Sequence, residues 1–273
     1  MSSLASKLRA SGRIVWDVAA YRVKKREAGN LVTSLTLAAA IGLAPRDIAY
    51  RAAFGVALNL FVYLVNDCFD VAIDLAAQGR DEARTRFLAA HTREGWGAVA
   101  ALGALVLALG AAHSRGLFVT AAVNVAVIFL YSRVLKHRPL LDLVAMGLWG
   151  ASMAMVGFPI DRADGWRLAG VLAILCMVTE AVQVLRDEPT DRAAGVRTTA
   201  VVLGPERTAL IARALMLAAA VYAAAYVNPV GAMFLAGVFV PLDPARASRS
   251  WDRLRVLFGL TWLAMLAVLR LSD

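Results

Sequence analysis

The chain has 273 residues, of which 60% are hydrophobic and 18% charged, and its mean hydropathy is +0.65. A soluble core of this size cannot bury so much apolar surface, so the composition excludes an ordinary soluble domain and predicts an integral membrane protein. The net charge is +9, yet the sequence shows no basic motif on a soluble face, which excludes a nucleic-acid partner.

The chain opens with a polar, basic segment, residues 1–29, which lacks the pattern of a cleavable signal peptide and is expected in the cytoplasm. Nine apolar runs follow, most of them close to the roughly 20 residues that a spanning helix needs. The first and eighth runs are short, so we expect them to be tilted, re-entrant or extended by flanking residues. The runs are Leu31–Leu43, Ile48–Val65, Trp96–Ala112, Leu117–Leu135, Leu140–Phe158, Trp166–Leu185, Leu210–Val227, Val230–Val240 and Leu254–Leu271. We predict an all-α membrane protein with a single domain, residues 1–273.

The distribution of basic residues tests this topology. With a cytoplasmic N-terminus, 23 of the 29 Lys and Arg residues fall on the cytoplasmic side. The six on the other side are Arg46, Arg51, Arg115, Arg162, Arg167 and Arg270. This bias supports nine spans in a multi-pass protein embedded in the lipid bilayer with its N-terminus inside.

An acidic cluster follows the second run. Asn59, Asn66, Asp67, Asp70 and Asp74 recur at helical spacing, so they continue one polar stripe from the membrane into the headgroup layer. Carboxylates gathered at one helix end repel one another unless a cation lies among them. The alternative is that they only solvate a helix end.

A second cluster follows the sixth run, on the same predicted side. Asp187 and Asp191 are one turn apart, and Glu180 and Gln183 extend the polar face into the membrane. Glu180 inside an apolar run indicates either a functional group or a salt bridge to a neighbouring arginine. Pro189 predicts that the membrane helix breaks here and a short helix begins.

A basic stretch lies at the inside end of the fourth run. It contains Tyr131, Lys136 and Arg138. Its cations serve either the membrane topology alone or a phosphate-bearing ligand whose charge grows on departure. Cys68, in a polar loop, and Cys176, in an apolar run, are both expected to be free thiols.

Two carboxylate sets facing each other across a bundle suit Mg²⁺, which prefers oxygen ligands and commonly bridges a protein to substrate phosphates. Asn-Asp-x-x-Asp-x-x-x-Asp at 66–74, Asp-x-x-x-Asp-x-x-x-Gly-x-x-Thr-Thr at 187–199 and Tyr-Ser-x-x-x-Lys at 131–136 together resemble the UbiA superfamily of intramembrane prenyltransferases. The resemblance covers nearly the whole chain. It implies nine transmembrane helices around a central cavity, with cytoplasmic cap helices in the two motif-bearing loops.

The resemblance also implies an activity: Mg²⁺-dependent transfer of an isoprenyl group from a prenyl diphosphate donor to a small lipophilic or aromatic acceptor. The expected metal ligands are Asp67, Asp70, Asp74, Asp187 and Asp191. The expected catalytic residues are Asp67, Asp70, Asp191 and Lys136. The expected substrate-binding residues are Asn59, Asn66, Arg80, Tyr131, Arg138, Glu180 and Gln183. Asp191 or Glu180 is expected to accept the proton that the acceptor loses.

One departure from the family pattern concerns the segment after the first motif, which lacks the Arg-Pro pair of many relatives. Arg80, Arg84 and Arg86 either replace it as phosphate contacts or pair with Asp81 and Glu82. The acceptor therefore stays open. A terpene cyclase and a transferase with a phosphorylated-sugar acceptor are alternatives, whereas a transporter fits less well because both clusters lie at one face rather than at mid-bilayer.

Overall fold

The structure is a computed structural model that describes residues 4–25, 27–76 and 82–272. These residues form helices and connecting turns, with no strand among them. The helices are α1 (Leu4–Lys24), α2 (Gly29–Ala40), α3 (Pro45–Ala76), α4 (Glu82–Ala90), α5 (Thr92–His113), α6 (Arg115–Arg133), η1 (Leu135–His137), α7 (Leu141–Ala154), η2 (Met155–Gly157), α8 (Ala163–Ala193), α9 (Thr199–Leu203), α10 (Pro205–Tyr226), η3 (Pro229–Phe239), η4 (Pro244–Arg246) and α11 (Ala247–Ser272).

Six of the described helices are long and apolar enough to cross a membrane: α3, α5, α6, α8, α10 and α11. Three shorter apolar segments, α2, α7 with η2, and η3, complete the set of predicted runs. The two runs expected to be short are α2 and η3, with 12 and 11 residues. The all-helical prediction is confirmed for the described residues, and the count of nine spanning helices stays a prediction.

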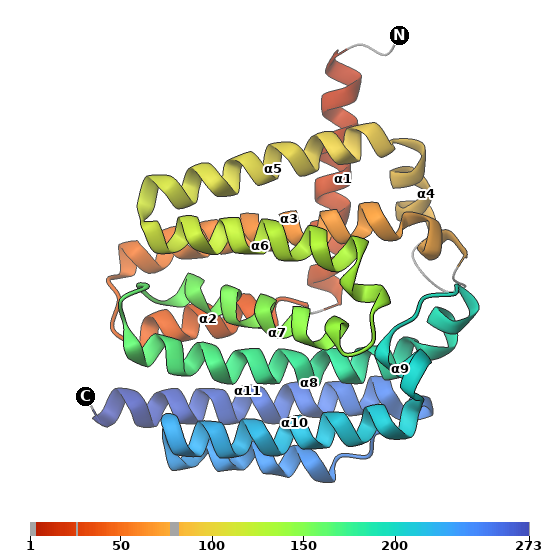
Figure 1. Ribbon diagram of the computed structural model, residues 1–273. Helices are drawn as coiled ribbons and strands as arrows, with labels where there is room; N and C mark the ends of the chain where they lie inside the picture. The colour runs from red at the N-terminus through yellow and green to blue at the C-terminus, as the bar shows by residue number, and fades with distance from the viewer. Residues whose placement is uncertain (1–3, 26, 77–81, 273) are drawn as a thin grey trace.

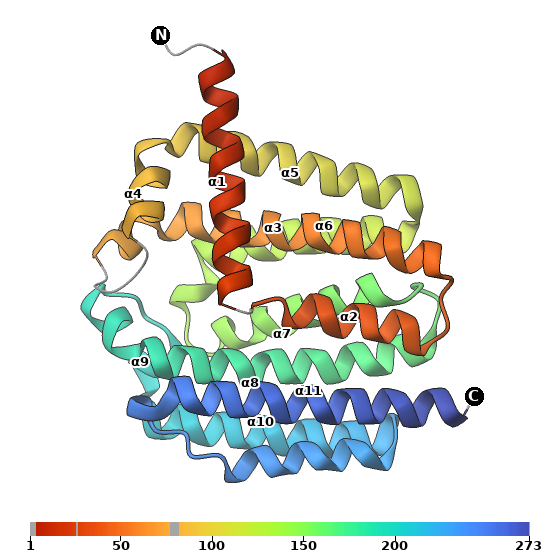
Figure 2. The ribbon, with the colours of Figure 1, turned by 180° about the vertical axis from the view of Figure 1, so that it is seen from behind.

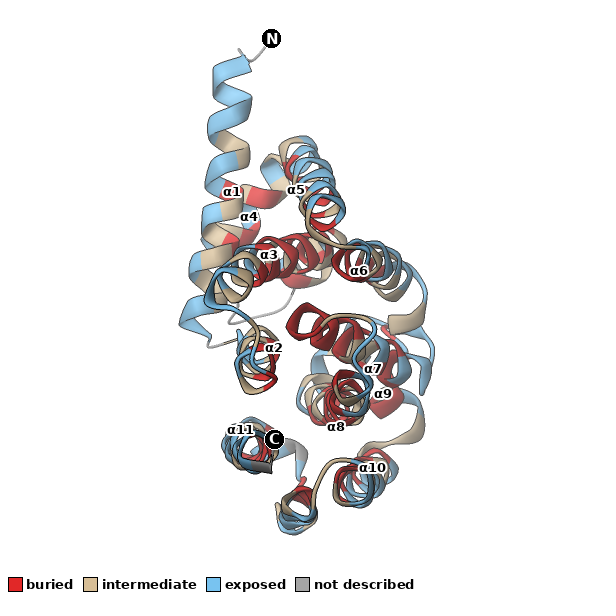
Figure 3. Cartoon of the chain, turned by 90° about the vertical axis from the view of Figure 1, so that its left-hand side faces the viewer, coloured by how far each residue is buried: buried red, intermediate tan, exposed pale blue. Residues whose placement is uncertain are grey.

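The long helices lie side by side, roughly parallel or antiparallel (Figures 1 and 2). Their contacts close a ring: α3 packs on α6, α6 on α7, α7 on α8, α8 on α11, α11 on α2, and α2 on α3. Figure 3 views this ring end-on, with α5 outside it against α3 and α6, and α10 outside it against α8. The predicted central cavity remains a prediction.

Both motif-bearing helices end on the same side of the bundle. The short helices α4 and α9 follow α3 and α8 there (Figure 1). Near this end, α1 crosses the bundle at a steep angle and packs on α3, α4 and α5 (Figure 2). The fold thus brings the two acidic sequence motifs, more than a hundred residues apart, to one end of the molecule.

The helix that carries the second motif is continuous through Pro189, so the predicted break is wrong. Proline removes one backbone N–H and crowds the preceding turn. Pro189 lies four residues before the end of α8, so only the last turn of the helix is affected by the missing hydrogen bond. The helix continues to Ala193 and is closed by Gly195, whose φ of 71° suits glycine. The N–H of Gly195 donates to Arg192 O, and that of Val196 donates to Asp191 O.

Candidate active site

The first acidic cluster lies on α3. Its three aspartates are buried, with Asp67 4%, Asp70 6% and Asp74 7% exposed. A buried carboxylate is costly unless it is paired with a cation or well hydrogen-bonded. Their partners therefore show what the site is built to hold.

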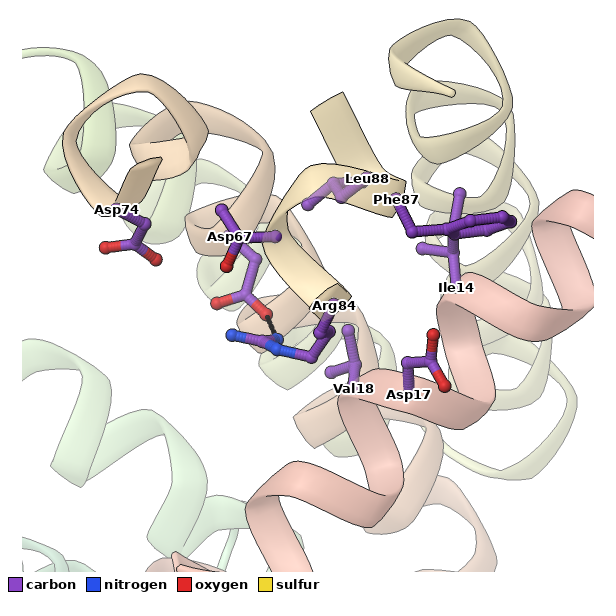
Figure 4. A pocket seen from close by; sticks show the side chains of 9 residues that line it. Ile14, Asp17, Val18, Asp67, Asp74, Arg84, Phe87 and Leu88 are labelled. Carbon is purple, nitrogen blue, oxygen red and sulfur yellow. Dashed lines mark hydrogen bonds and ion pairs between the residues drawn. The ribbon is translucent and has the colours of Figure 1, made fainter. Parts of the chain in front are cut away.

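Asp67 is held by two guanidinium groups. Arg22 of α1 donates to Asp67 Oδ1 at 2.6 Å, and Arg84 of α4 donates to Asp67 Oδ2 at 2.5 Å; Figure 4 shows the Arg84 contact. Arg22 also pairs with Glu27 at 2.6 Å and stacks on Tyr63. Burial lowers the pKa of Arg22, but attraction to Asp67 and Glu27 outweighs it and raises that pKa above its ordinary value. Arg22 therefore stays charged.

Asp70 is held by an ammonium group and an amide. Lys136, in η1, donates to Asp70 Oδ2 at 2.6 Å, and Asn66 donates to the same oxygen at 3.0 Å from one turn earlier in α3. The lysine is largely shielded, with 16% of its side chain exposed. Such charge-assisted hydrogen bonds between shielded groups are stronger than neutral ones.

The basic stretch contacts both acidic helices. While Lys136 binds Asp70 of α3, Tyr131 at the end of α6 donates its hydroxyl to Glu180 Oε1 of α8 at 2.8 Å. Glu180 is buried, with 4% exposed. The salt bridge to an arginine was one expectation for Glu180, and the contact that the structure shows is with the Tyr131 phenol. One short segment thus ties the two motif-bearing helices together.

Two carboxylates of the second acidic cluster pair with arginines of their own helix. Asp187 accepts two hydrogen bonds from its neighbour Arg186, at 2.8 Å each, and Glu188 pairs with Arg192 one turn later. Asp187 and Asp191 are half-buried. These pairs do not connect α8 to α3. The cations at Asp67 and Asp70, by contrast, come from other elements of the fold.

Thr199, the last threonine of the second motif, has a structural role. Asp142, fully buried at the start of α7, accepts hydrogen bonds from the backbone N–H and from the hydroxyl of Thr199. The Thr199 hydroxyl also accepts from the backbone N–H of Leu140 at 2.7 Å. These bonds fasten the segment after α8 to α7, and so fix the end of the helix that carries Asp187 and Asp191.

Other predicted site residues are placed as follows. Asn59 is buried in α3, where its amide donates to the Gly55 carbonyl of its own helix, and Gln183 is half-buried in α8. Arg138 is exposed just after η1. Arg80 lies outside the described residues. Cys68 was expected in a polar loop, but it is buried inside α3, because α3 continues past the apolar run to Ala76.

Sequence reasoning missed Arg22 and Glu27, which it treated only as part of a basic N-terminal segment. Arg22 lies 45 residues before Asp67, and no local pattern links them. An arginine in the last turn of an amphipathic helix is also the common way to complement the helix dipole. No signal short of the tertiary structure distinguishes this arginine from its neighbours.

The donor chemistry fits a divalent metal shared with a ligand rather than a metal enclosed by protein alone. In the part of the chain that the structure describes, no three His, Cys, Asp or Glu side chains converge into a ready-made metal cage. Mg²⁺ usually takes one or two carboxylates from the protein and keeps water or phosphate oxygens in its other positions. Buried aspartates on α3 and open aspartates on α8, with cations between them, suit that mode of binding.

Comparisons with known proteins agree with this arrangement. The model of the UbiA prenyltransferase family matches residues 29–268. Lycopene elongase/hydratase from Haloferax volcanii is 33% identical over 82% of this chain and 75% of its own length. Digeranylgeranylglyceryl phosphate synthase from Ignicoccus hospitalis is 30% identical over 77% of this chain and 72% of its own length.

Solved structures share the fold. A UbiA homolog from Archaeoglobus fulgidus bound to GPP and Mg²⁺ superposes with a TM-score of 0.67 at 18% identity, over 94% of this chain and 99% of that one. A digeranylgeranylglyceryl phosphate synthase superposes with a TM-score of 0.71 at 16% identity, over 96% of this chain and 98% of that one. The chain is therefore a member of the UbiA prenyltransferase family, an intramembrane prenyltransferase with several membrane-spanning helices.

Proposed function

We propose that this enzyme transfers an isoprenyl group from a prenyl diphosphate to a hydrophobic or aromatic acceptor in the membrane, with Mg²⁺ at the diphosphate. The observation that carries the proposal is the segment that joins the two acidic helices. Lys136 binds Asp70 of α3, and Tyr131 binds Glu180 of α8. A diphosphate bound between these helices would have metal-binding carboxylates on both sides, from α3 and from α8. Cations such as Lys136 would lie beside it.

In this proposal, Mg²⁺ is held by aspartates of both motifs: Asp67, Asp70 and Asp74 on α3, and Asp187 and Asp191 on α8. When bound, the metal supplies charge neutralisation of the diphosphate and so makes it a better leaving group. The UbiA homolog from Archaeoglobus fulgidus with GPP and Mg²⁺ supports this use of the fold.

The cations around the α3 cluster have a second role when the donor binds. Arg22, Arg84 and Lys136 now compensate the buried charges of Asp67 and Asp70. With Mg²⁺ held by those carboxylates, the same cations would be available to contact the phosphate oxygens. They then stabilise the charge that grows on the leaving group, where preorganised donors contribute most to catalysis.

The reaction breaks the bond between the allylic carbon and the diphosphate oxygen, and the electron pair leaves with the diphosphate. The acceptor forms its new bond to the allylic carbon and loses a proton. Glu180, buried beside Tyr131, and Asp191 are the candidate proton acceptors on α8.

The preferred acceptor is a lipophilic molecule without phosphate. The relative named lycopene elongase/hydratase, at 33% identity, supports this class. A phosphate-bearing lipid acceptor is the second candidate, supported by the relatives named digeranylgeranylglyceryl phosphate synthase. The charge bias of the sequence supports a cytoplasmic N-terminus, and we infer from it that both acidic motifs lie at the cytoplasmic face.

The test uses the purified chain in nanodiscs, incubated with prenyl diphosphates of increasing length and with lipid extract as the acceptor source. Diphosphate release and a prenylated lipid, found by mass spectrometry, are expected with Mg²⁺ and not with EDTA. Release of diphosphate when only the donor is present, together with a cyclic hydrocarbon product, would identify a terpene cyclase instead. Absence of release from every donor, with Mg²⁺ and lipid extract present, would overturn the proposal.

A further inference from the structure

The helix α1 lies before the region that matches the family model, which begins at residue 29. It crosses the bundle at a steep angle, and its N-terminal half projects beyond the neighbouring helices (Figures 1 and 2). Figure 3 shows the same projection, with exposed residues covering most of that half. A projecting half-helix of this kind is marginal in water, because short isolated helices are unstable.

The side chains of α1 divide into three faces at helical spacing. The first face packs on the protein through Ile14 and Val18, each 2% exposed. Ile14 approaches Gly95 of α5, and Ser11 donates to the carbonyl of Glu94 at 3.1 Å. This face fixes the position of α1 against the start of α5.

The second face is apolar and exposed. Leu4, Leu8, Trp16 and Val23 are 75%, 65%, 71% and 75% exposed. At 100° per residue they fall within a sector of about 120°. Apolar side chains of this size each favour burial by roughly 1.5 to 3 kcal/mol, so an aligned set of four indicates an apolar environment that covers them.

The third face is polar and basic. Arg9, Arg13, Asp17 and Lys24 lie on it, and all but Asp17 are exposed. Arg13 pairs with Asp17 at 3.5 Å and stacks over Phe87 of α4, so this face also borders α4. Residues 4–25 carry six Lys or Arg residues against one Asp, and five of the six remain once Arg22, which pairs with Asp67 and Glu27, is set aside. A helix that lies on a membrane beside a protein has three neighbours: protein, lipid and water. The three faces of α1 match them.

The contacts of α1 place it at the edge of the hydrocarbon layer. It touches α5 at the first turn, near Glu94, and α3 near Asp67, 22 residues after Pro45. Because the spans begin and end there, α1 runs along the membrane plane at headgroup depth. Trp16 suits this depth, since tryptophan is enriched at membrane interfaces.

We propose that α1 binds the lipid surface that surrounds the bundle: its apolar face enters the boundary of the acyl chains, and its basic residues bind anionic lipid headgroups. Amphipathic helices of this composition lie in the interface with the apolar face buried to about 5 to 10 Å. The excess of positive charge on the helix is complementary to anionic lipid. The inference is independent of the reaction that the enzyme catalyses.

The test uses the full chain in nanodiscs of phosphatidylcholine, with or without phosphatidylglycerol, and an environment-sensitive fluorophore on one introduced cysteine. Leu8→Cys and Val23→Cys report the apolar face, and Lys24→Cys is the matched control on the basic face. Cys68 and Cys176 are buried, and the unsubstituted chain labelled in parallel gives their background. Brominated lipid chains and aqueous iodide serve as the two quenchers.

We expect brominated lipid to quench the label at positions 8 and 23 more than at position 24, and iodide to show the reverse order. With phosphatidylglycerol present, Lys7→Gln combined with Arg9→Gln should weaken docking at position 8, roughly fivefold for each charge removed. Iodide quenching at all three positions, with no lipid quenching, would overturn the proposal. If the labels on the apolar face were protected from both quenchers, and only in nanodiscs that hold two chains, a second copy of the protein would cover this face. That result would also overturn the proposal.

Discussion

The two acidic clusters are built in opposite ways. On α3, buried carboxylates receive cations from three other elements, with Arg22 from α1, Arg84 from α4 and Lys136 from η1. On α8, Asp187 and Glu188 pair with arginines of their own helix, one and four residues away. The first arrangement depends on the tertiary structure, and the second does not.

The difference suggests a division of labour within the site. The α3 cluster is preorganised, because its charges are fixed and compensated before any ligand arrives. In each pair of the α8 cluster the arginine is exposed to solvent, although the Glu188 side chain is only 13% exposed, and pairs with an exposed partner cost little to break. We infer that the donor first meets the fixed α3 side, and that the α8 side closes on the bound diphosphate. Four predictions test this comparison.

The largest effect is expected on turnover. Asp70→Asn and Asp191→Asn should each lower kcat by on the order of 100-fold or more, because each removes a carboxylate proposed to hold Mg²⁺. Glu188→Gln is the matched control: it lies in the same helix as Asp191, pairs with Arg192 and is not a proposed ligand. Single-turnover rates with Mg²⁺ and with EDTA give the measurement. Wild-type rates in both aspartate variants would remove these residues from the site.

The next effect concerns stability, where the two clusters should differ most. Asp67→Asn removes the negative charge that compensates Arg22 and Arg84 and so leaves shielded positive charge without its partner. It should lower the free energy of unfolding by about 3 kcal/mol. Asp187→Asn breaks a pair whose side chains are about a third exposed, so the expected loss is under about 1 kcal/mol. Unfolding by denaturing detergent in mixed micelles compares the two. Equal losses would mean that the clusters do not differ in the way described.

Much of this architecture could be predicted from the sequence, because hydrophobic runs and helical spacing are local properties. The helical segments occur where the apolar runs predict them, and the stripe from Asn59 to Asp74 lies on one continuous helix, α3. The contact of the 131–136 stretch with both acidic helices agrees with the expected neighbourhood of the three motifs.

What the sequence did not predict depends on tertiary packing or on the ends of helices. Arg22 reaches Asp67 only because α1 folds back across the bundle. Pro189 suggested a break and Cys68 a loop, because both lie where an apolar run gives way to polar residues. The helices in fact continue into that polar zone, to Ala193 and Ala76. The end of an apolar run marks the edge of the membrane and not the end of the helix.

A third, smaller effect should separate two neighbouring cations. Lys136→Ala should raise the KM for the prenyl diphosphate about tenfold, since a charge-assisted hydrogen bond contributes roughly 1.5 kcal/mol, and should leave the acceptor KM unchanged. Arg133→Ala is the matched control, because Arg133, the last residue of α6, is an exposed neighbouring cation that is not a proposed substrate contact, and its loss should alter neither KM. If Lys136→Ala left the KM for the prenyl diphosphate as unchanged as the control does, Lys136 would serve membrane topology alone.

The smallest effect is expected from an arginine of the open cluster. Arg192→Gln removes the partner of Glu188, but 58% of the Arg192 side chain is exposed, so the free energy of unfolding should change by less than about 1 kcal/mol. Arg84→Gln is its counterpart in the α3 cluster, where the side chain is 12% exposed and its loss should cost several times more. High salt sharpens the contrast, because it screens the Glu188 pair and leaves the shielded Asp67 pair nearly intact. If Arg192→Gln proved as costly as Arg84→Gln, and the cost persisted in high salt, the α8 cluster would be as firmly built as the α3 cluster, and the inferred order in which they meet the donor would fail.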